Sequence, residues 1–150
     1  MKAASEAPLR IVLADDHPIF LIGLRAVLER DERVRIVAEA NSPQALIEQL
    51  QTCACDVLVT DFMMPAEPQA DGLRLIEQLR RYYPGLPIVV VTMLNNAGLF
   101  HSILKLGVMG LLSKASLADE LPQAIHHVRQ GRPYVAHALS LIHISEPTRL

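Results

Sequence analysis

The 150-residue chain is 51% hydrophobic and 20% charged with a net charge of -2, a composition typical of one folded domain and not of a disordered segment. The interspersed acids and bases leave no basic footprint, which argues against nucleic-acid binding by this chain itself. The apolar runs are too short for a membrane span, and residues 1–8 lack the apolar core of a signal peptide, so we expect a cytoplasmic location and no membrane contact.

The first half of the chain alternates apolar runs with amphipathic stretches. A strand over 9–13 ends at an acidic pair, and Pro18 is suited to the first turn of a helix that reaches about Arg30. A strand over 34–38, a helix with Ser42 as N-cap and a buried strand over 56–60 follow. The first helix carries more apolar residues than a solvated surface needs, and three of them lie partly off its inner face: Ile19, Leu21 and Ile22.

The second half repeats this alternation. We expect helices over 73–82, 95–106 and 117–130, and strands over 88–92 and 108–112. In the helix over 95–106, Leu99, Ile103 and Leu106 should point inward, with Gly107 as a C-terminal cap. Pro122 would be tolerated in the first turn of the last helix.

Five strands alternating with five helices predict an α/β fold, because short parallel strands joined by right-handed crossover helices form a three-layer, doubly wound sandwich. Two cysteines, Cys53 and Cys55, are one residue apart, a spacing that disfavours a disulfide. Two thiols alone do not complete a zinc site either, so we expect them to be small, partly buried residues at a helix–strand junction.

Polar residues follow the predicted strands where each one ends. Asp15 and Asp16 follow the first strand, Asp61 the third, Thr92 closes the fourth and Lys114 follows the fifth. The carboxyl ends of parallel strands meet at one edge of a sheet, where ligands bind. Each residue also has a simpler interpretation: Asp61 as a turn cap, Thr92 as a strand end, Lys114 as a surface lysine. Five such residues at successive strand ends favour a shared site.

Three crowded carboxylates repel one another, and one of them would take up a proton unless a cation lay between them. Oxygen ligands with several charges suit Mg²⁺, to which the backbone carbonyl of Met63 could be added. A carboxylate beside such an ion is a workable nucleophile toward phosphorus, and gives an aspartyl-phosphate. The charge of Lys114 would neutralise phosphoryl oxygens, and the hydroxyl of Thr92 could donate a hydrogen bond to one of them.

The stretches at 14–18 (Ala-Asp-Asp-His-Pro), 61–65 (Asp-Phe-Met-Met-Pro), 91–92 (Val-Thr) and 112–114 (Leu-Ser-Lys) resemble the receiver domain of two-component response regulators. The His-Pro after the acidic pair resembles the LuxR-type regulators, near their capsule-synthesis branch. The resemblance implies a flavodoxin-like fold with a five-stranded sheet of order 2-1-3-4-5. It also implies phosphotransfer from a sensor histidine kinase or phosphotransfer protein to Asp61. Mg²⁺ would be held by Asp15, Asp16, Asp61 and the Met63 carbonyl, with switch roles for Thr92 and Lys114.

The resemblance covers about residues 9 to 135, and we place the receiver domain at residues 9–131. Residues 132–150 would be the start of a linker and a non-native tail, since 141–150 do not resemble the linker of the family. LuxR-type regulators bind DNA through a C-terminal helix-turn-helix domain, which is absent from this chain. Two positions depart from many receivers: Leu111 replaces an aromatic switch residue, and Ala115 replaces the proline after the lysine.

We expect a signalling domain and not an enzyme. Phosphorylation would draw in Thr92 and shift the following loop, ending in altered self-association as a homodimer. The dimer surface would be either the fourth helix with the fifth strand and last helix, or the first helix with its surplus apolar residues against the last helix.

Three other functions fit the sequence less well. An interaction module of the same fold would not need every site residue, and none is lost. Phosphatases that use an aspartyl-phosphate usually carry a second Asp two residues later, where this chain has Met63. Dinucleotide-binding enzymes need a glycine-rich first turn, and Asp15-Asp16-His17 has no glycine.

Overall fold

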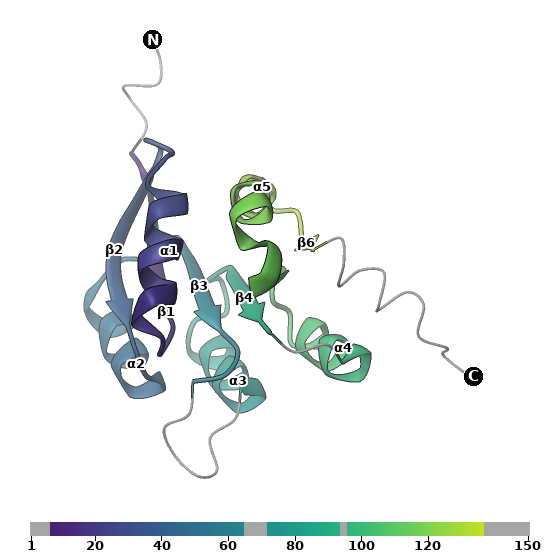
Figure 1. Ribbon diagram of the computed structural model, residues 1–150. Coiled ribbons are helices and arrows are strands. Elements are labelled where there is room, and N and C mark those ends of the chain that lie inside the picture. Colours follow the sequence, from purple (N-terminus) through teal and green to yellow (C-terminus); the bar gives the residue numbers. More distant parts are fainter. Residues whose placement is uncertain (1–6, 65–71, 94–95, 137–150) are drawn as a thin grey trace.

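The computed structural model describes residues 7–64, 72–93 and 96–136. In this part of the chain a central parallel sheet has helices on both faces (Figure 1). Helices α1 and α5 pack together on one face, and α2, α3 and α4 cover the other. The elements are β1 (Leu9–Ala14), α1 (Pro18–Leu28), β2 (Val34–Ala40), α2 (Pro43–Thr52), β3 (Val57–Asp61), α3 (Gly72–Tyr82), β4 (Ile88–Thr92), α4 (Ala97–Lys105), β5 (Gly110–Ser113), the 3₁₀ turn η2 (Lys114–Ser116), α5 (Leu117–Arg129) and β6 (Tyr134–Val135).

The sheet order is β2-β1-β3-β4-β5-β6, so the predicted order 2-1-3-4-5 is confirmed and one strand is added at the edge. The added strand β6 pairs with β5 through Gly110 and Leu111. The Tyr134 hydroxyl donates a 2.7 Å hydrogen bond to Glu120 of α5, and its ring lies edge-on to that of His127 at 5.1 Å. A strand of two residues shows no periodicity in the sequence, and this one exists because α5 and β5 hold it in place.

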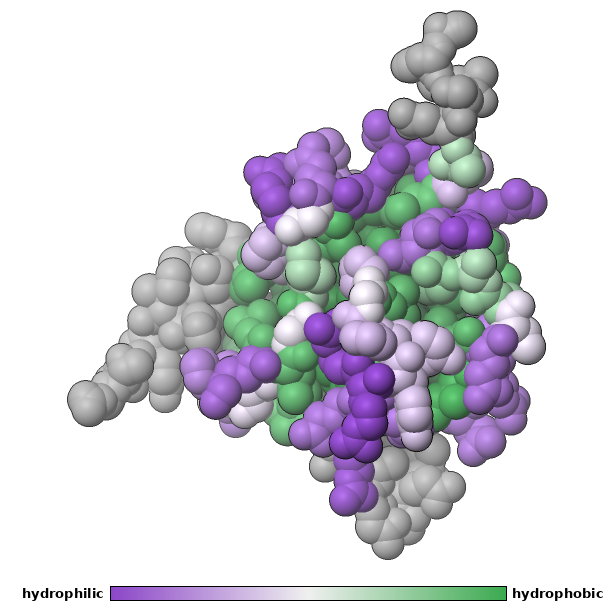
Figure 2. Space-filling model, turned by 180° about the vertical axis from the view of Figure 1, so that it is seen from behind, coloured by the Kyte–Doolittle hydropathy of each residue, from purple (hydrophilic) through white to green (hydrophobic). Residues whose placement is uncertain are grey.

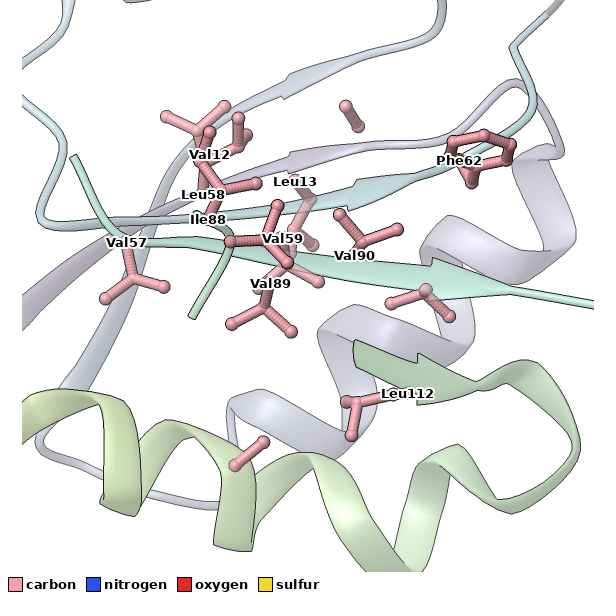
Figure 3. Packing of buried hydrophobic residues seen from close by; sticks show 14 of the residues in the cluster. Val12, Leu13, Val57, Leu58, Val59, Phe62, Ile88, Val89, Val90 and Leu112 are labelled. Atoms are coloured by element: carbon pink, nitrogen blue, oxygen red, sulfur yellow. The ribbon is translucent and has the colours of Figure 1, made fainter. Parts of the chain in front are cut away.

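The core lies where the central strands are covered on both faces. Every residue of β3 and β4 is buried, which is the burial expected of parallel strands with helices on each side. Figure 3 shows Val59, Val89 and Val90 packed among the neighbouring strands of this layer, and Phe62 directly after β3. The strongly β-branched sequence of β4 therefore reflects complete burial.

Several helix ends follow the sequence signals. The Ser42 hydroxyl accepts a 3.1 Å hydrogen bond from the Ala45 N–H with Pro43 at the first helical position, and the predicted N-cap is confirmed. Gly107 has a φ of +92°, as the predicted C-terminal cap of α4 requires. The guanidinium of Arg80 lies against this turn and donates to the Leu106 carbonyl at 3.2 Å, so α3 is tied to the end of α4.

The packing of α4 and α5 differs from the prediction. In α4 the fully buried residues are Phe100 and Ile103, whereas Leu99 and Leu106 are only half-buried. Pro122 is the sixth residue of α5 and not in its first turn, because η2 precedes the helix and α5 begins at Leu117. Pro122 has no N–H to donate to the carbonyl of Ala118, four residues earlier in the helix. Both residues are exposed, so water can donate to this carbonyl instead.

The outer surface is that of amphipathic helices. From behind, hydrophilic side chains gather at several places, and hydrophobic residues are visible between them (Figure 2). None of the described helices combines the length and apolar character needed to cross a bilayer.

Both cysteines are free and half-buried, as expected, and burial raises the pKa of the Cys55 thiol to about 11. The predicted loop at 66–71 and the tail at 141–150 lie outside the described residues.

Replacing Phe100 by alanine tests the observed inner face of α4. The side chain is fully buried, so Phe100→Ala should lower the free energy of unfolding by about 3 to 5 kcal/mol. The exposed neighbour Lys105 provides the control, because Lys105→Ala should change stability by less than about 0.5 kcal/mol. Urea denaturation measures both, and equal stabilities of the two variants would contradict this packing.

Candidate functional site

The register of the sheet brings the predicted residues to one edge. Ala14 of β1 is paired with Thr60 of β3, so the residues that follow them, Asp15 and Asp61, are neighbours. Lys114 comes directly after β5 as the first residue of η2. All three therefore lie at the carboxyl ends of parallel strands, as the sequence predicts.

Lys114 joins two of the carboxylates. Its Nζ lies 2.9 Å from Asp15 Oδ2 and 3.2 Å from Asp61 Oδ2, and the three side chains are 6%, 1% and 3% exposed respectively. The same Nζ is 4.2 Å from the centre of the Phe20 ring of α1, a cation–π distance. The structure thus adds a contact between the first helix and the site lysine.

His17 completes the cluster, although the sequence pattern predicts no role for it. Its Nδ1 lies 3.0 Å from Asp15 Oδ1, 3.1 Å from Asp16 Oδ1 and 4.0 Å from Asp61 Oδ2. Its backbone N–H donates a 2.8 Å hydrogen bond to Asp15 Oδ1, while its side chain is 64% exposed. In the sequence, the position of His17 directly after Asp15 and Asp16 is the feature that could have indicated its place in this cluster.

The electrostatics leave negative charge in excess, with three carboxylates facing one lysine. Burial, and next the charge of Asp15, raise the pKa of Asp61 above its ordinary value, against the opposing effects of Lys114 and of the Met63 N–H, which donates to Asp61 Oδ1 at 3.3 Å. In the described part of the chain, two buried oxygens make no hydrogen bond: Asp15 Oδ2, despite its approach to Lys114, and Asp16 Oδ1. A bound cation would reduce the repulsion between the carboxylates and would give both oxygens a positively charged partner. These residues therefore fit a hard divalent ion.

Thr92 and Met63 lie at the same edge. Thr92 is fully buried and is the residue after Val91, which pairs with Asp61. The Met63 side chain is exposed, and its N–H contacts the Asp61 carboxylate. A metal-ligand role for its carbonyl stays a prediction, and Pro65 lies outside the described residues.

Comparison with known proteins shows which protein family the chain belongs to. Residues 11–126 match the response regulator receiver domain family, and the chain belongs to this family. Its parallel sheet with helices on both faces is the fold of the solved receiver domains that it resembles, so the flavodoxin-like prediction is confirmed.

Several of the relatives are versions of the regulator RcsB. The chain is 36% identical to the transcriptional regulatory protein RcsB of Escherichia coli strain K12 over 132 residues, which are 88% of this chain and 61% of RcsB. The isolated REC domain of RcsB from Salmonella enterica serovar Typhimurium, solved with the phosphomimetic BeF₃⁻, gives a TM-score of 0.86 at 35% identity, with coverage of 90% of this chain and 98% of that one.

An RcsB–DNA complex gives a TM-score of 0.88 at 34% identity, with coverage of 95% of this chain and 71% of that one. The expected likeness to LuxR-type, RcsB-like receivers is thus confirmed. The chain spans only 61% of the length of the curated relative, and the likeness is to its receiver part.

Replacing Asp61 by asparagine should stabilise the metal-free domain near neutral pH. Because the pKa of Asp61 is raised, the folded chain holds a proton there more readily than the unfolded chain, whose ordinary value is 3.8. Stability from this group is therefore present below that value and is lost as the pH rises through the folded pKa. Thermal unfolding in a chelator should show a higher midpoint for Asp61→Asn at about pH 7, with the difference shrinking toward about pH 4.

Asp56 provides a control of opposite sign. Hydrogen bonds from Arg10 lower the pKa of Asp56, so its contribution to stability is present above its ordinary value and is lost as the pH falls through the folded pKa. Asp56→Asn should therefore not stabilise the domain at neutral pH. If Asp61→Asn proved less stable than wild type across the whole pH range, the assigned charge repulsion would be wrong.

Proposed function

We propose that Asp61 is the phosphoacceptor, that it receives its phosphoryl group from a sensor histidine kinase or phosphotransfer protein, and that phosphorylation alters self-association to control transcription. The observation that carries the proposal is the buried Asp61 carboxylate, which shares the single Lys114 ammonium with Asp15 of the acidic pair. A phosphomimetic complex of the similar RcsB receiver supports it.

The chain's own residues suit the transfer step. The Met63 N–H and Lys114 hold the two oxygens of Asp61, which fixes the direction of the carboxylate. A carboxylate oxygen would attack the phosphorus of a phosphohistidine, forming a P–O bond as the P–N bond breaks, and the leaving imidazole nitrogen would take up a proton. Lys114 would offset the charge on the transferred phosphoryl oxygens.

Mg²⁺ would be held by the carboxylates of Asp15, Asp16 and Asp61, with the Met63 carbonyl as a further ligand. When bound, the ion supplies positive charge for the equatorial phosphoryl oxygens. Two atoms support this assignment, because Asp16 Oδ1 is buried without a hydrogen bond and Asp15 Oδ2 shares the single Lys114 ammonium with Asp61.

Thr92 would sense the modification. Its hydroxyl is fully buried at the end of β4, beside the strand that carries Asp61, and it starts the segment leading to α4. Leu111 is fully buried and carries no polar tip, so it cannot alternate between buried and exposed states as an aromatic switch would. The signal would therefore travel through the segment 93–96, of which residues 94 and 95 lie outside the described part, and then through α4.

Self-association would use the outer face of α1 against α5. Ile19 and Ile22 are 84% and 68% exposed, whereas Leu21 is half-buried and does not belong to this surface. Exposed apolar residues one turn apart favour a contact surface. The other surface, formed by α4, β5 and α5, stays open as the alternative.

The remaining parts of the proposal concern the whole regulator. Because the similar RcsB was solved on DNA and the chain covers only 61% of curated RcsB, DNA binding would reside in a C-terminal helix-turn-helix domain. The domain at 9–131 would be followed by a linker, although β6 at Tyr134–Val135 still belongs to the sheet. The protein would act in the cytoplasm as a signalling component without enzymatic turnover.

Phosphorylation of Asp61 can be measured directly as intact mass after incubation with Mg²⁺ and a small acyl-phosphate donor. Wild type should gain one acid-labile phosphoryl group, and Asp61→Asn should gain none because it lacks the nucleophile. Asp16→Ala, or excess chelator, should abolish labelling by removing the cation site. An unlabelled but folded wild type would favour a phosphorylation-independent interaction module of the same fold.

The output can be followed by sedimentation with and without beryllofluoride. Wild type should shift toward a dimer, whereas Ile22→Glu should stay monomeric because a charge enters the apolar contact. Thr92→Ala should still be labelled on Asp61 but should not shift, since the hydroxyl that senses the phosphoryl group is lost. Dimerisation of Ile22→Glu at the wild-type level would move the interface to α4, β5 and α5.

A further inference from the structure

We propose that His17 is an additional protein ligand in the acidic pocket and that it makes the pocket a site for borderline divalent transition metals such as Zn²⁺. Its regulatory consequence rests on the proposed phosphoacceptor function. Bound at the same carboxylates, the transition metal would exclude Mg²⁺ and so prevent phosphorylation of Asp61.

The positions of the candidate donor atoms suit one ion. Ligand atoms that each lie about 2.1 Å from one shared metal ion cannot be more than about 4.2 Å apart. His17 Nδ1 lies 3.0 Å from Asp15 Oδ1, 3.1 Å from Asp16 Oδ1 and 4.0 Å from Asp61 Oδ2. All four residues can present donor atoms that lie within 4.8 Å of one another.

Hydrogen bonding alone does not account for this arrangement. Nδ1 of an imidazole offers either one hydrogen or one lone pair, yet it faces two carboxylate oxygens at nearly equal distance. Asp15 Oδ1 already accepts the His17 backbone N–H, and Asp16 Oδ1 is buried without a hydrogen bond. A cation shared by the ring nitrogen and the carboxylates would satisfy all of these atoms together.

Donor chemistry decides the class of ion. Carboxylate and carbonyl oxygens suit Mg²⁺ and Mn²⁺, whereas imidazole suits Zn²⁺, Cu²⁺ and Ni²⁺. His17 should therefore matter little for Mg²⁺ and a great deal for Zn²⁺. The residue is well placed for this role, because it precedes α1 without capping it through its side chain, and that side chain is largely exposed.

Calorimetric titration of the full chain with Zn²⁺, and separately with Mg²⁺, tests the proposal without reference to phosphorylation. Loss of even an outer-shell partner weakens metal binding by about 10- to 100-fold, so His17→Gln should weaken Zn²⁺ binding by at least about tenfold. Mg²⁺ binding should change by less than about threefold, because this ion prefers the carboxylate oxygens to an imidazole nitrogen. Asp16→Asn should weaken the binding of both ions.

His126→Gln serves as the matched control, since His126 is exposed on α5, an element that contributes no ligand. It should leave Zn²⁺ binding unchanged. A second readout is the visible spectrum of bound Co²⁺, which should change in His17→Gln and not in His126→Gln. Equal Zn²⁺ affinities of wild type and His17→Gln, with both proteins folded by circular dichroism, would overturn the proposal and leave His17 as a hydrogen-bond donor only.

Phosphorylation with Mg²⁺ at increasing Zn²⁺ then tests the consequence. Zn²⁺ should inhibit labelling of wild type at lower concentrations than it inhibits labelling of His17→Gln. If wild type is not labelled in Mg²⁺ alone, the proposed function fails, while the titration still decides the role of His17. If labelling succeeds and Zn²⁺ inhibits both proteins equally, the regulatory role of His17 is overturned.

Discussion

The site is organised around one buried lysine placed between two buried carboxylates. Lys114 contacts Asp15 from the end of β1 and Asp61 from the end of β3, and its own position after β5 joins these strand ends at one edge of the sheet. One positive charge cannot balance Asp15, Asp16 and Asp61 in a dry environment. The raised pKa of Asp61 and the two buried oxygens without hydrogen bonds both express that deficit. The edge is thus built to receive further positive charge.

Holding such charges together opposes folding, and the fully buried strands on either side provide the offset. Every residue of β3 and β4 is buried, so Asp61 extends from a rigid layer that cannot relax to separate the carboxylates. A phosphoryl group on Asp61, as proposed, would therefore add charge at a fixed point of the structure.

Hydrogen bonds connect the site with the edge of the sheet beyond β5. Ser116 of η2 donates to Glu120, and Glu120 accepts the Tyr134 hydroxyl of β6. A chain of hydrogen bonds therefore runs from the turn that contains Lys114 to the last described strand. The half-buried Phe20 beneath Lys114 joins α1 to the same site. Both features place α1 and the start of α5 beside the charged cluster.

The sequence by itself determined the alternating parallel fold and the helix caps at Ser42 and Gly107. It also determined that Asp15, Asp16, Asp61 and Lys114 lie at one edge of the sheet. Hydrophobic periodicity and the ends of strands can be recognised locally in the sequence, and in a parallel sheet the carboxyl ends of the strands lie at the same edge. Only the tertiary structure decided which face of α4 is buried, that Pro122 lies inside α5, that β6 joins the sheet, and that Phe20 and His17 meet the charged cluster. These features depend on contacts between segments distant in sequence or on the orientation of a single ring. A linear pattern does not encode either of them, because both are fixed only when the layers pack.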